Sequence, residues 1–427
     1  MPRRSTTRRA FVAAAGAAAL AGCSDVGSGG RSDEEISPTE LPDVPDEGEA
    51  VPVVGDDLPV DIERDHLADA AGRVTELLEP LPLPLGPGAV PNGVVREELA
   101  TAAAEARSGV ETARSSPTRL SALASLRRAR TEARFAAEGW AFVEDGRTAA
   151  ALREELAATA DEAETFRADR EYVGDDPVRA AVVHARIERY LDRAADRDGP
   201  SAVERSNDLL TVAEWGDHAE SARAHLSDAR YLDDRFTTSL SSSRDLGSTF
   251  ADAADALRGT LRERRRELPS PPTDGGDRDL AVDVQYRLRS DADSAVDRVL
   301  DADRPATAVL RAVEGLVDVL AYGRIRRRAD EEGDLRPQDG ADVRRVRSAA
   351  LEAVPAALET APRPALGREV LSDIAERLTV ADDELRRTRR AVRPAALDDA
   401  VRRYLAATAR ARSVPEATER VAATLTG

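Results

Sequence analysis

The sequence predicts an all-α protein: a multi-helix bundle or helical array of about a dozen helices, preceded by a disordered tether. Apolar residues recur at helical spacing from about residue 58 onward, and period-two runs of β-branched residues are missing. Apolar residues make up 41% of the 427 residues, which is enough to bury a sizeable core. Helix-start signals also divide this pattern into separate elements.

The first 22 residues predict an export signal. A basic start is followed by an apolar run over residues 10–21, about half the length that a membrane-spanning helix needs. Arg8 and Arg9, followed by Phe11, resemble the twin-arginine export motif, and no acidic residue precedes Asp25. The resemblance implies that the chain is exported from the cytoplasm in a folded state.

The export signal ends at a predicted lipid-attachment site. Residues 20–23 read Leu-Ala-Gly-Cys and resemble a lipobox, in which small residues precede a cysteine that is cleaved and lipidated. Cys23 is the only cysteine, which excludes an intrachain disulfide and suits lipid attachment. The alternative is a frayed N-terminal helix with an unrelated cysteine. We expect a lipid anchor on Cys23 and a location on the external face of the cell membrane.

Composition divides the remainder into a tether and two helical regions. Residues 23–57 are rich in Gly, Ser, Pro, Asp and Glu without periodicity, which predicts a lipidated cysteine and a flexible acidic tether. Residues 58–268 and 279–427 are predicted to form two helical regions that can pack as one unit. The Pro- and Gly-rich stretch over residues 269–277 is the strongest internal break.

Helix starts are marked by capping residues. Asp176-Pro177 and Ser116-Pro117 each place an N-cap residue before a first-turn proline, and residues 201–204 fit a capping box. The spacing between such marks predicts amphipathic helices that bury one face. The apolar positions include Leu152, Leu156, Ala163 and Phe166; Val183, Ile187, Leu191 and Ala194; and Val370, Ile374, Leu378 and Ala381.

Two further segments are predicted to fill or close the core. Residues 306–325 form the most apolar stretch, but Arg311, Glu314 and Asp318 interrupt it at helical spacing, which predicts a central packed helix rather than a membrane span. Residues 80–88 alternate proline with leucine, which predicts an extended connector whose leucines close one end of a core. A docking site for a partner is the alternative for this connector.

The charge balance argues against nucleic-acid binding and indicates a salt-rich environment. The chain has 80 acidic and 61 basic residues, a formal charge of −19 and only 3% aromatic residues, so we expect no nucleic-acid partner. All 61 basic residues are arginine. This composition is similar to that of proteins from extremely halophilic archaea, although a GC-rich genome also replaces lysine codons with arginine codons.

The usual catalytic signatures are missing. The sequence contains no G-x-S-x-G elbow, no Walker loop, no G-x-G-x-x-G between a strand and a helix, and no C-x-x-C. Acidic pairs occur at Asp175-Asp176, Asp233-Asp234, Asp382-Asp383 and Asp398-Asp399. Such a pair would suit a hydrolase, but solvated surface carboxylates are expected in so acidic a chain. We therefore predict no enzyme activity, no catalytic residue and no cofactor.

Two of the four histidines are weak candidates for a metal site. His218 and His225 lie seven residues apart, so one helix places both on the same face, with Glu214 one turn before them and Asp228 nearby. The alternative is a pair of solvated or capping histidines on an acidic helix. The sequence leaves open whether a metal is bound.

One stretch is basic against the acidic background. Residues 386–412 carry nine arginines and two acids, and the arginines are densest at Arg386, Arg387, Arg389 and Arg390. One interpretation is contact with anionic lipid headgroups, with an acidic partner or with the acidic face of a second copy. The alternative is a helix whose arginines pair with acids on neighbouring helices.

These features are similar to those of haloarchaeal lipoproteins exported by the twin-arginine route. Residues 1–23 carry the resemblance by motif, and the rest of the chain carries it by composition alone. It implies a membrane-anchored extracytoplasmic protein, and we favour a non-enzymatic binding or scaffolding role with an extracytoplasmic protein partner. The alternative is a metal- or substrate-binding lipoprotein that serves a transporter or sensor through His218 and His225.

The acidic composition predicts that folding depends on salt. Repulsion among excess carboxylates is costly at low ionic strength, whereas in about 1 M salt the Debye length is about 3 Å and the repulsion is largely screened. We expect partial loss of helical circular dichroism when salt is dialysed away. An unchanged helical spectrum in dilute buffer would refute this expectation.

Overall fold

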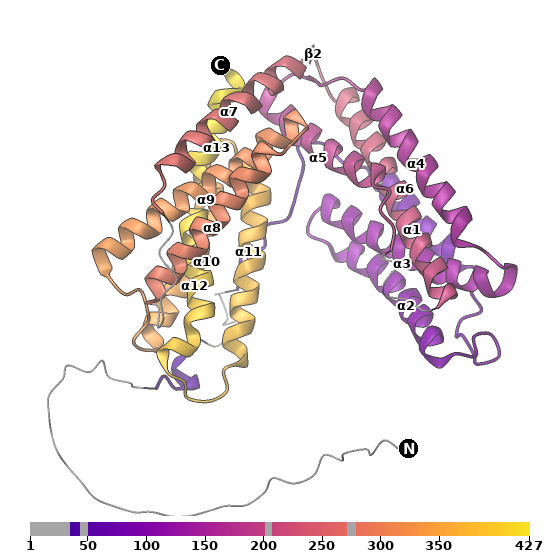
Figure 1. Cartoon of the computed structure of the whole chain (residues 1–427), viewed down its shortest axis with the longest axis horizontal. Helices are drawn as coiled ribbons and strands as arrows, with labels where there is room; N and C mark the ends of the chain where they lie inside the picture. The colour runs from indigo at the N-terminus through magenta and orange to yellow at the C-terminus, as the bar shows by residue number, and fades with distance from the viewer. Residues whose placement is uncertain (1–34, 43–49, 201–206, 271–278) are drawn as a thin grey trace, which may run out of the picture.

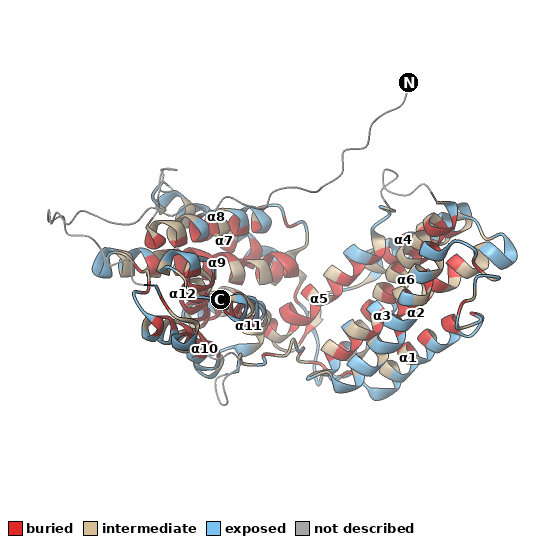
Figure 2. Ribbon diagram, turned by 90° about the horizontal axis from the view of Figure 1, so that it is seen from below, coloured by how far each residue is buried: buried red, intermediate tan, exposed pale blue. Residues whose placement is uncertain are grey.

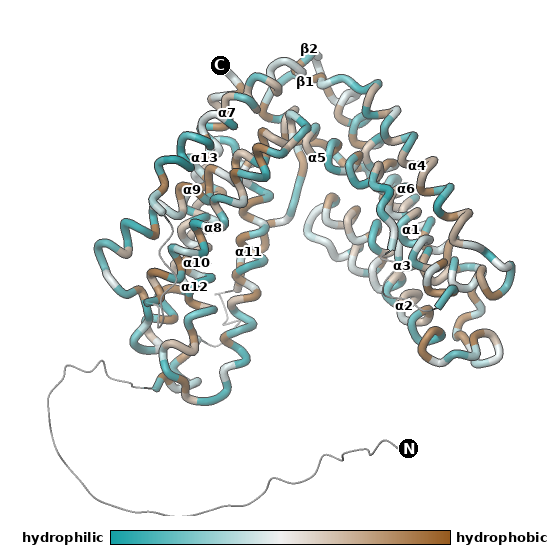
Figure 3. Tube along the Cα trace, in the orientation of Figure 1, coloured by the Kyte–Doolittle hydropathy of each residue, from teal (hydrophilic) through white to brown (hydrophobic). Residues whose placement is uncertain are grey.

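The computed structural model describes residues 35–42, 50–200, 207–270 and 279–427, and these ranges are helical almost throughout. The only strands among them are β1 (Val173–Gly174) and β2 (Arg244–Asp245), which pair antiparallel with each other. The predicted all-α fold class is therefore confirmed. No helix in the described ranges is long and apolar enough to cross a membrane, and Figure 3 shows hydrophobic and hydrophilic positions interspersed along the helices.

The helices form two groups that diverge from a common apex (Figure 1). The first helical group consists of α1 (Arg64–Leu78), α2 (Gly93–Ser115), α3 (Arg119–Asp145), α4 (Ala149–Asp169) and α6 (Asp208–Thr238). The second helical group consists of α7 (Gly247–Glu267), α8 (Leu280–Leu300), α9 (Pro305–Glu332), α10 (Gly340–Thr360), α11 (Pro364–Arg387), α12 (Asp398–Ala411) and α13 (Val414–Thr426). Helix α5 (Pro177–Ala195) lies at the apex and packs on α4 and α6 of the first group and on α9 of the second. Short 3-10 turns are η1 (Pro38–Glu40) and η2 (Pro394–Leu397).

Small side chains let the helices of the first group approach closely. Helices α3 and α6 lie at its centre, with α1 and α2 packed on α3, and α4 packed on α6. Buried alanines such as Ala136 of α3 and Ala219 of α6 occupy the contact faces. Residues 80–88 bury Leu81 and Leu85 against this group, which is the packing that their alternating leucines predict.

Helix α9 is the central element of the second group. It contacts α7, α8, α12 and α13, and it buries Val309, Val313 and Val317. Figure 2 shows buried positions concentrated where the helices of each group face one another. Asp318, one of the charges that interrupt the apolar stretch, lies 2.7 Å from Nε of Arg410. The charge is therefore paired within the packed group instead of being left alone in an apolar environment.

A buried carboxylate on α5 joins the apex to the second group. Glu188 is 2% exposed, and its oxygens lie 2.6 Å from the backbone nitrogen of Thr307 and 3.4 Å from that of Ala306. Both amides belong to the first turn of α9, which has no side-chain cap of its own. Tyr172 donates a further hydrogen bond to Glu188 at 2.6 Å. Glu188 thus satisfies amides that a helix N-terminus leaves unpaired, and its charge complements the helix dipole.

Part of the predicted tether packs against the helices, which corrects the expectation of a flexible segment up to residue 57. Residues 35–42 lie at the end of the second group that is far from the apex, and residues 50–63, here called the strap, run beside α11 to the apex and into α1 (Figure 1). Ile36, Leu41 and Val54 are buried. Hydrophobic contact with the helices fixes these isolated apolar residues, and no periodicity in the sequence signals it.

The predicted helix starts agree with the structure at one place and differ at another. Asp176 is the N-cap of α5, and its side chain accepts a hydrogen bond from the backbone nitrogen of Arg179 at 2.8 Å. Ser116, however, ends α2, and α3 begins later with Thr118 as its cap. Thr118 takes this role because its side chain accepts a backbone hydrogen bond in the first turn of α3. The predicted capping box at residues 201–204 lies outside the described residues.

The junction predicts a large loss of stability from a single substitution. Glu188→Ala leaves buried amides and the Tyr172 hydroxyl without their acceptor, so we expect the free energy of unfolding to fall by about 3 kcal/mol. Denaturant titration followed by circular dichroism measures the loss. The control Glu164→Ala removes an exposed carboxylate paired with Arg167, and it should change the free energy of unfolding by less than about 0.5 kcal/mol. Equal effects of the two substitutions would contradict this role of Glu188.

Candidate functional site

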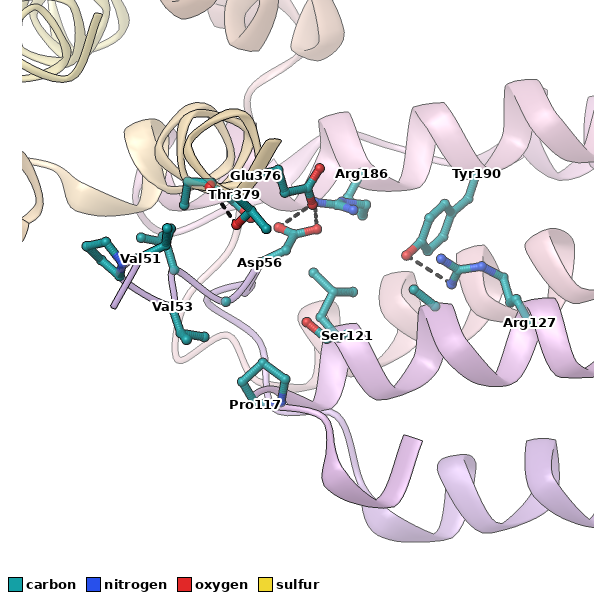
Figure 4. A pocket seen from close by; sticks show the side chains of 17 residues that line it. Val51, Val53, Asp56, Pro117, Ser121, Arg127, Arg186, Tyr190, Glu376 and Thr379 are labelled. Carbon is teal, nitrogen blue, oxygen red and sulfur yellow. Dashed lines mark hydrogen bonds and ion pairs between the residues drawn. The ribbon is translucent and has the colours of Figure 1, made fainter. Parts of the chain in front are cut away.

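A pocket lies at the junction of the two helical groups, between the strap and helices α3, α5 and α11 (Figure 4). Its volume is about 440 Å³, which is the size of a site for a small molecule. Apolar side chains line much of it. The polar residues at its wall are Asp56 of the strap, Ser121 and Arg127 of α3, Arg186 and Tyr190 of α5, and Ser372, Glu376 and Thr379 of α11.

The arginines of this pocket are already paired. Nη2 of Arg186 lies 2.8 and 2.7 Å from the two carboxylate oxygens of Asp56. Arg127 donates to Asp228 at 2.7 Å and to the Tyr190 hydroxyl at 3.1 Å, and its guanidinium lies 4.5 Å from the centroid of the Tyr190 ring. The charges of Arg186 and Arg127 are thus balanced by the carboxylates of Asp56 and Asp228. The arrangement can hold a small molecule by shape and hydrogen bonding.

No motif or spacing in the sequence distinguishes these pocket residues. Asp56 and Arg186 are separated by 130 residues, and Arg127 and Asp228 by 101. In a chain with 61 arginines and 80 acids, no local signal distinguishes the pairs that meet. The apolar residues of the strap are the one signal in the sequence that points to a packed segment here.

His225, one of the two metal candidates, lies on α6 against Tyr190. The two ring centroids are 5.6 Å apart, and Nδ1 of His225 donates to the carbonyl oxygen of Ser221 at 2.8 Å. Burial, and after it the nearby Arg127 guanidinium, lower the pKa of His225 to about 4. The ring is therefore neutral and hydrogen-bonded to its own helix near neutral pH.

His218, the other candidate, lies beside Trp215, with ring centroids 6.3 Å apart. Asp228, the acid expected near the pair, instead accepts hydrogen bonds from His66 at 2.9 Å and from Arg127. In the part of the chain that the structure describes, no group of three or more His, Cys, Asp or Glu side chains is placed to hold a metal ion. Among the described residues, the structure thus shows no further metal ligand that would complete a site with His218 and His225.

All four predicted acidic pairs contribute carboxylates to ion pairs within the fold. Asp382 is 1% exposed and accepts hydrogen bonds from Nε of Arg347 at 3.0 Å and from the Tyr404 hydroxyl at 2.5 Å. Asp398 lies 2.6 Å from Nη2 of Arg336. Each of these carboxylates is engaged by a partner within the fold.

The predicted basic stretch divides into paired and exposed arginines. Arg386 pairs with Asp383, one turn earlier on α11. Arg387 at the end of α11, and Arg389 and Arg390 in the loop that follows, are exposed. The predicted export and lipidation residues lie outside the described residues; these are Arg8, Arg9, Phe11 and Cys23.

Two family models match the helical part of the chain. Residues 65–243 match a domain of unknown function (DUF8262). Residues 247–423 match another domain of unknown function (DUF8264). No curated protein and no solved structure matches the chain. The two matched ranges meet between α6 and α7. The second match therefore includes α7 together with the helices that α7 packs against. The break expected from composition at residues 269–277 lies after α7 instead.

The buried, neutral ring of His225 predicts sensitivity to acid. Its pKa is near 6.5 when unfolded but about 4 in the folded protein, so the unfolded state binds the proton first and acidification through this window favours unfolding. We expect the stability of the wild type relative to His225→Gln to fall by about 2 kcal/mol between pH 7 and pH 4. Thermal unfolding of both proteins at constant salt measures this difference. Parallel pH profiles would show that protonation of His225 is not linked to folding.

Proposed function

We propose that the protein is a membrane-anchored extracytoplasmic lipoprotein that binds or scaffolds another molecule without catalysing a reaction. Twin-arginine export and lipidation of Cys23 attach it to the external face of the cell membrane. Its acidic, lysine-free composition suits a salt-rich exterior. An extracytoplasmic protein is the expected partner.

The observation that carries this proposal is the position of Ile36 in the fold. Ile36 is 2% exposed and exchanges two backbone hydrogen bonds with Val392, at 2.8 and 3.0 Å. It lies only 13 residues after Cys23. Residues 35–42 lie at the end of the second group that is far from the apex (Figure 1). A lipid on Cys23 is compatible with both helical groups standing outside the bilayer.

The junction pocket supports a binding role. Its walls come from α3 of the first group and α11 of the second, so a molecule held there contacts both groups. Among the alternatives, a substrate-binding lipoprotein that serves a transporter or sensor draws support from the same pocket. The metal-binding form of that alternative draws none from His218 and His225, because Asp228 is engaged by other residues.

Cell fractionation tests the anchor. In a host with twin-arginine export, we expect the wild type in the membrane fraction, extractable by detergent, with a lipid on Cys23 that mass spectrometry detects. Cys23→Ala should lack the lipid and appear as an exported, soluble chain. As a control on the export route, the double variant Arg8→Lys, Arg9→Lys should accumulate as precursor in the cytoplasm.

One result would overturn the proposed function outright. That result is recovery of the wild-type chain from the cytosol in a water-soluble and unprocessed form. A membrane fraction that retains Cys23→Ala as firmly as the wild type would likewise exclude the lipid on Cys23 as the anchor.

A further inference from the structure

Four exposed arginines lie within five residues of Val392, which pairs with Ile36 of the N-terminal segment. Val392 pairs with Ile36, and it lies in the loop between α11 and η2 that carries most of these arginines. The four residues, here called the arginine surface, are Arg387, Arg389, Arg390 and Arg393.

The arginine surface differs from its surroundings because its members have no ion-pair partner among the described residues. Arg386, the preceding residue, pairs with Asp383. Arg403 of α12 pairs with Glu384 at 3.0 Å. The chain has 80 acids for 61 arginines, yet these four arginines, which lie within seven positions of one another, have no carboxylate partner among the residues that the structure describes. Such a cluster presents donors suited to an external anion.

The N-terminal segment connects this surface to the proposed lipid anchor. Glu35 lies twelve residues after Cys23, so even a fully extended segment spans at most about 40 Å. The arginine surface lies at the end of the second group where this segment arrives, whereas the apex lies at the opposite end (Figure 1). A lipid on Cys23 therefore keeps the arginine surface closer to the bilayer than a random orientation of the molecule would.

We propose that the arginine surface binds the phosphate groups of anionic membrane lipids and thereby orients the protein on the bilayer. The proposal rests on the lipid anchor proposed above and names the partner of this surface. A planar guanidinium matches two phosphate oxygens with parallel hydrogen bonds. In about 1 M salt, longer-range attraction is screened within about 3 Å, so binding there depends on such direct contacts.

One acid of the described N-terminal segment, Glu40, is engaged within that segment. The carboxylate of Glu40 accepts a hydrogen bond from the backbone nitrogen of Ser37 at 2.8 Å and closes the capping box of η1. The backbone carbonyl of Glu40, and not its carboxylate, accepts from Arg344. The segment therefore supports the loop through Ile36 while its Glu40 charge is engaged locally.

Vesicle flotation tests this proposal in the absence of the lipid anchor. The full chain carrying Cys23→Ser is mixed with vesicles of phosphatidylglycerol and phosphatidylcholine, or of phosphatidylcholine alone, in about 1 M salt. We expect stronger binding to the vesicles that contain phosphatidylglycerol. Replacing the arginine surface with Arg387→Gln, Arg389→Gln, Arg390→Gln and Arg393→Gln should reduce the partition coefficient on those vesicles about tenfold or more.

A matched variant changes the net charge equally at other places. The substitutions Arg64→Gln, Arg107→Gln, Arg128→Gln and Arg244→Gln replace four exposed arginines on the first group and at the apex. This variant should bind phosphatidylglycerol vesicles like the parent chain, because its arginine surface is intact. Helical circular dichroism of all three chains verifies that each is folded.

Three outcomes would overturn the proposal. The first is equal loss of binding in the two variants, which would indicate a net-charge effect, and the second is no preference of the parent chain for phosphatidylglycerol. The third is loss of self-association in light scattering by the arginine-surface variant with vesicle binding unchanged, which would assign the surface to the acidic face of a second copy. Fractionation of Cys23→Ala judges the anchor separately, because the vesicle assay contains no lipidated cysteine.

Discussion

The carboxylate of Glu188 is the contact on which the two-group architecture depends. It belongs to α5 at the apex, yet it closes the N-terminus of α9, around which the second group is packed. Burial and the adjacent Glu188 charge raise the pKa of Tyr172, so the Tyr172 hydroxyl remains a hydrogen-bond donor to this carboxylate. One buried acid thereby fixes the start of the central helix relative to the apex.

Arginine serves opposite roles in the interior and at one end of this molecule. Inside the second group, Arg347 is completely buried, and its charge is matched by Asp382, which also binds Tyr404. A guanidinium can be buried in this way because its planar donors are satisfied by a carboxylate in fixed geometry. At the arginine surface the arginine side chains are exposed to solvent instead. This contrast is the reason for proposing an external anion as the ligand of that surface.

Local patterns in the sequence predicted the helices, whereas long-range pairing decided the site. Apolar spacing and the Asp176 cap depend on residues within a few turns, so the all-α class and the start of α5 followed directly. The packing of Ile36 and the ion pair between Arg186 and Asp56 join segments far apart in the chain, and no spacing rule reports them. The same limit applies to the predicted metal site at His218 and His225. Asp228, which the sequence places near them, forms a hydrogen bond with His66, and His66 lies 162 residues away in the chain.

The pairing of Ile36 with Val392 has a mechanical consequence. Tension applied at the N-terminus reaches this two-bond clamp before it reaches the strap, because Ile36 precedes the strap in the chain. While the clamp holds, the load passes into the second helical group. The strap, which forms one wall of the junction pocket, then carries no load. The pocket would therefore keep its shape while the N-terminus of the protein is pulled.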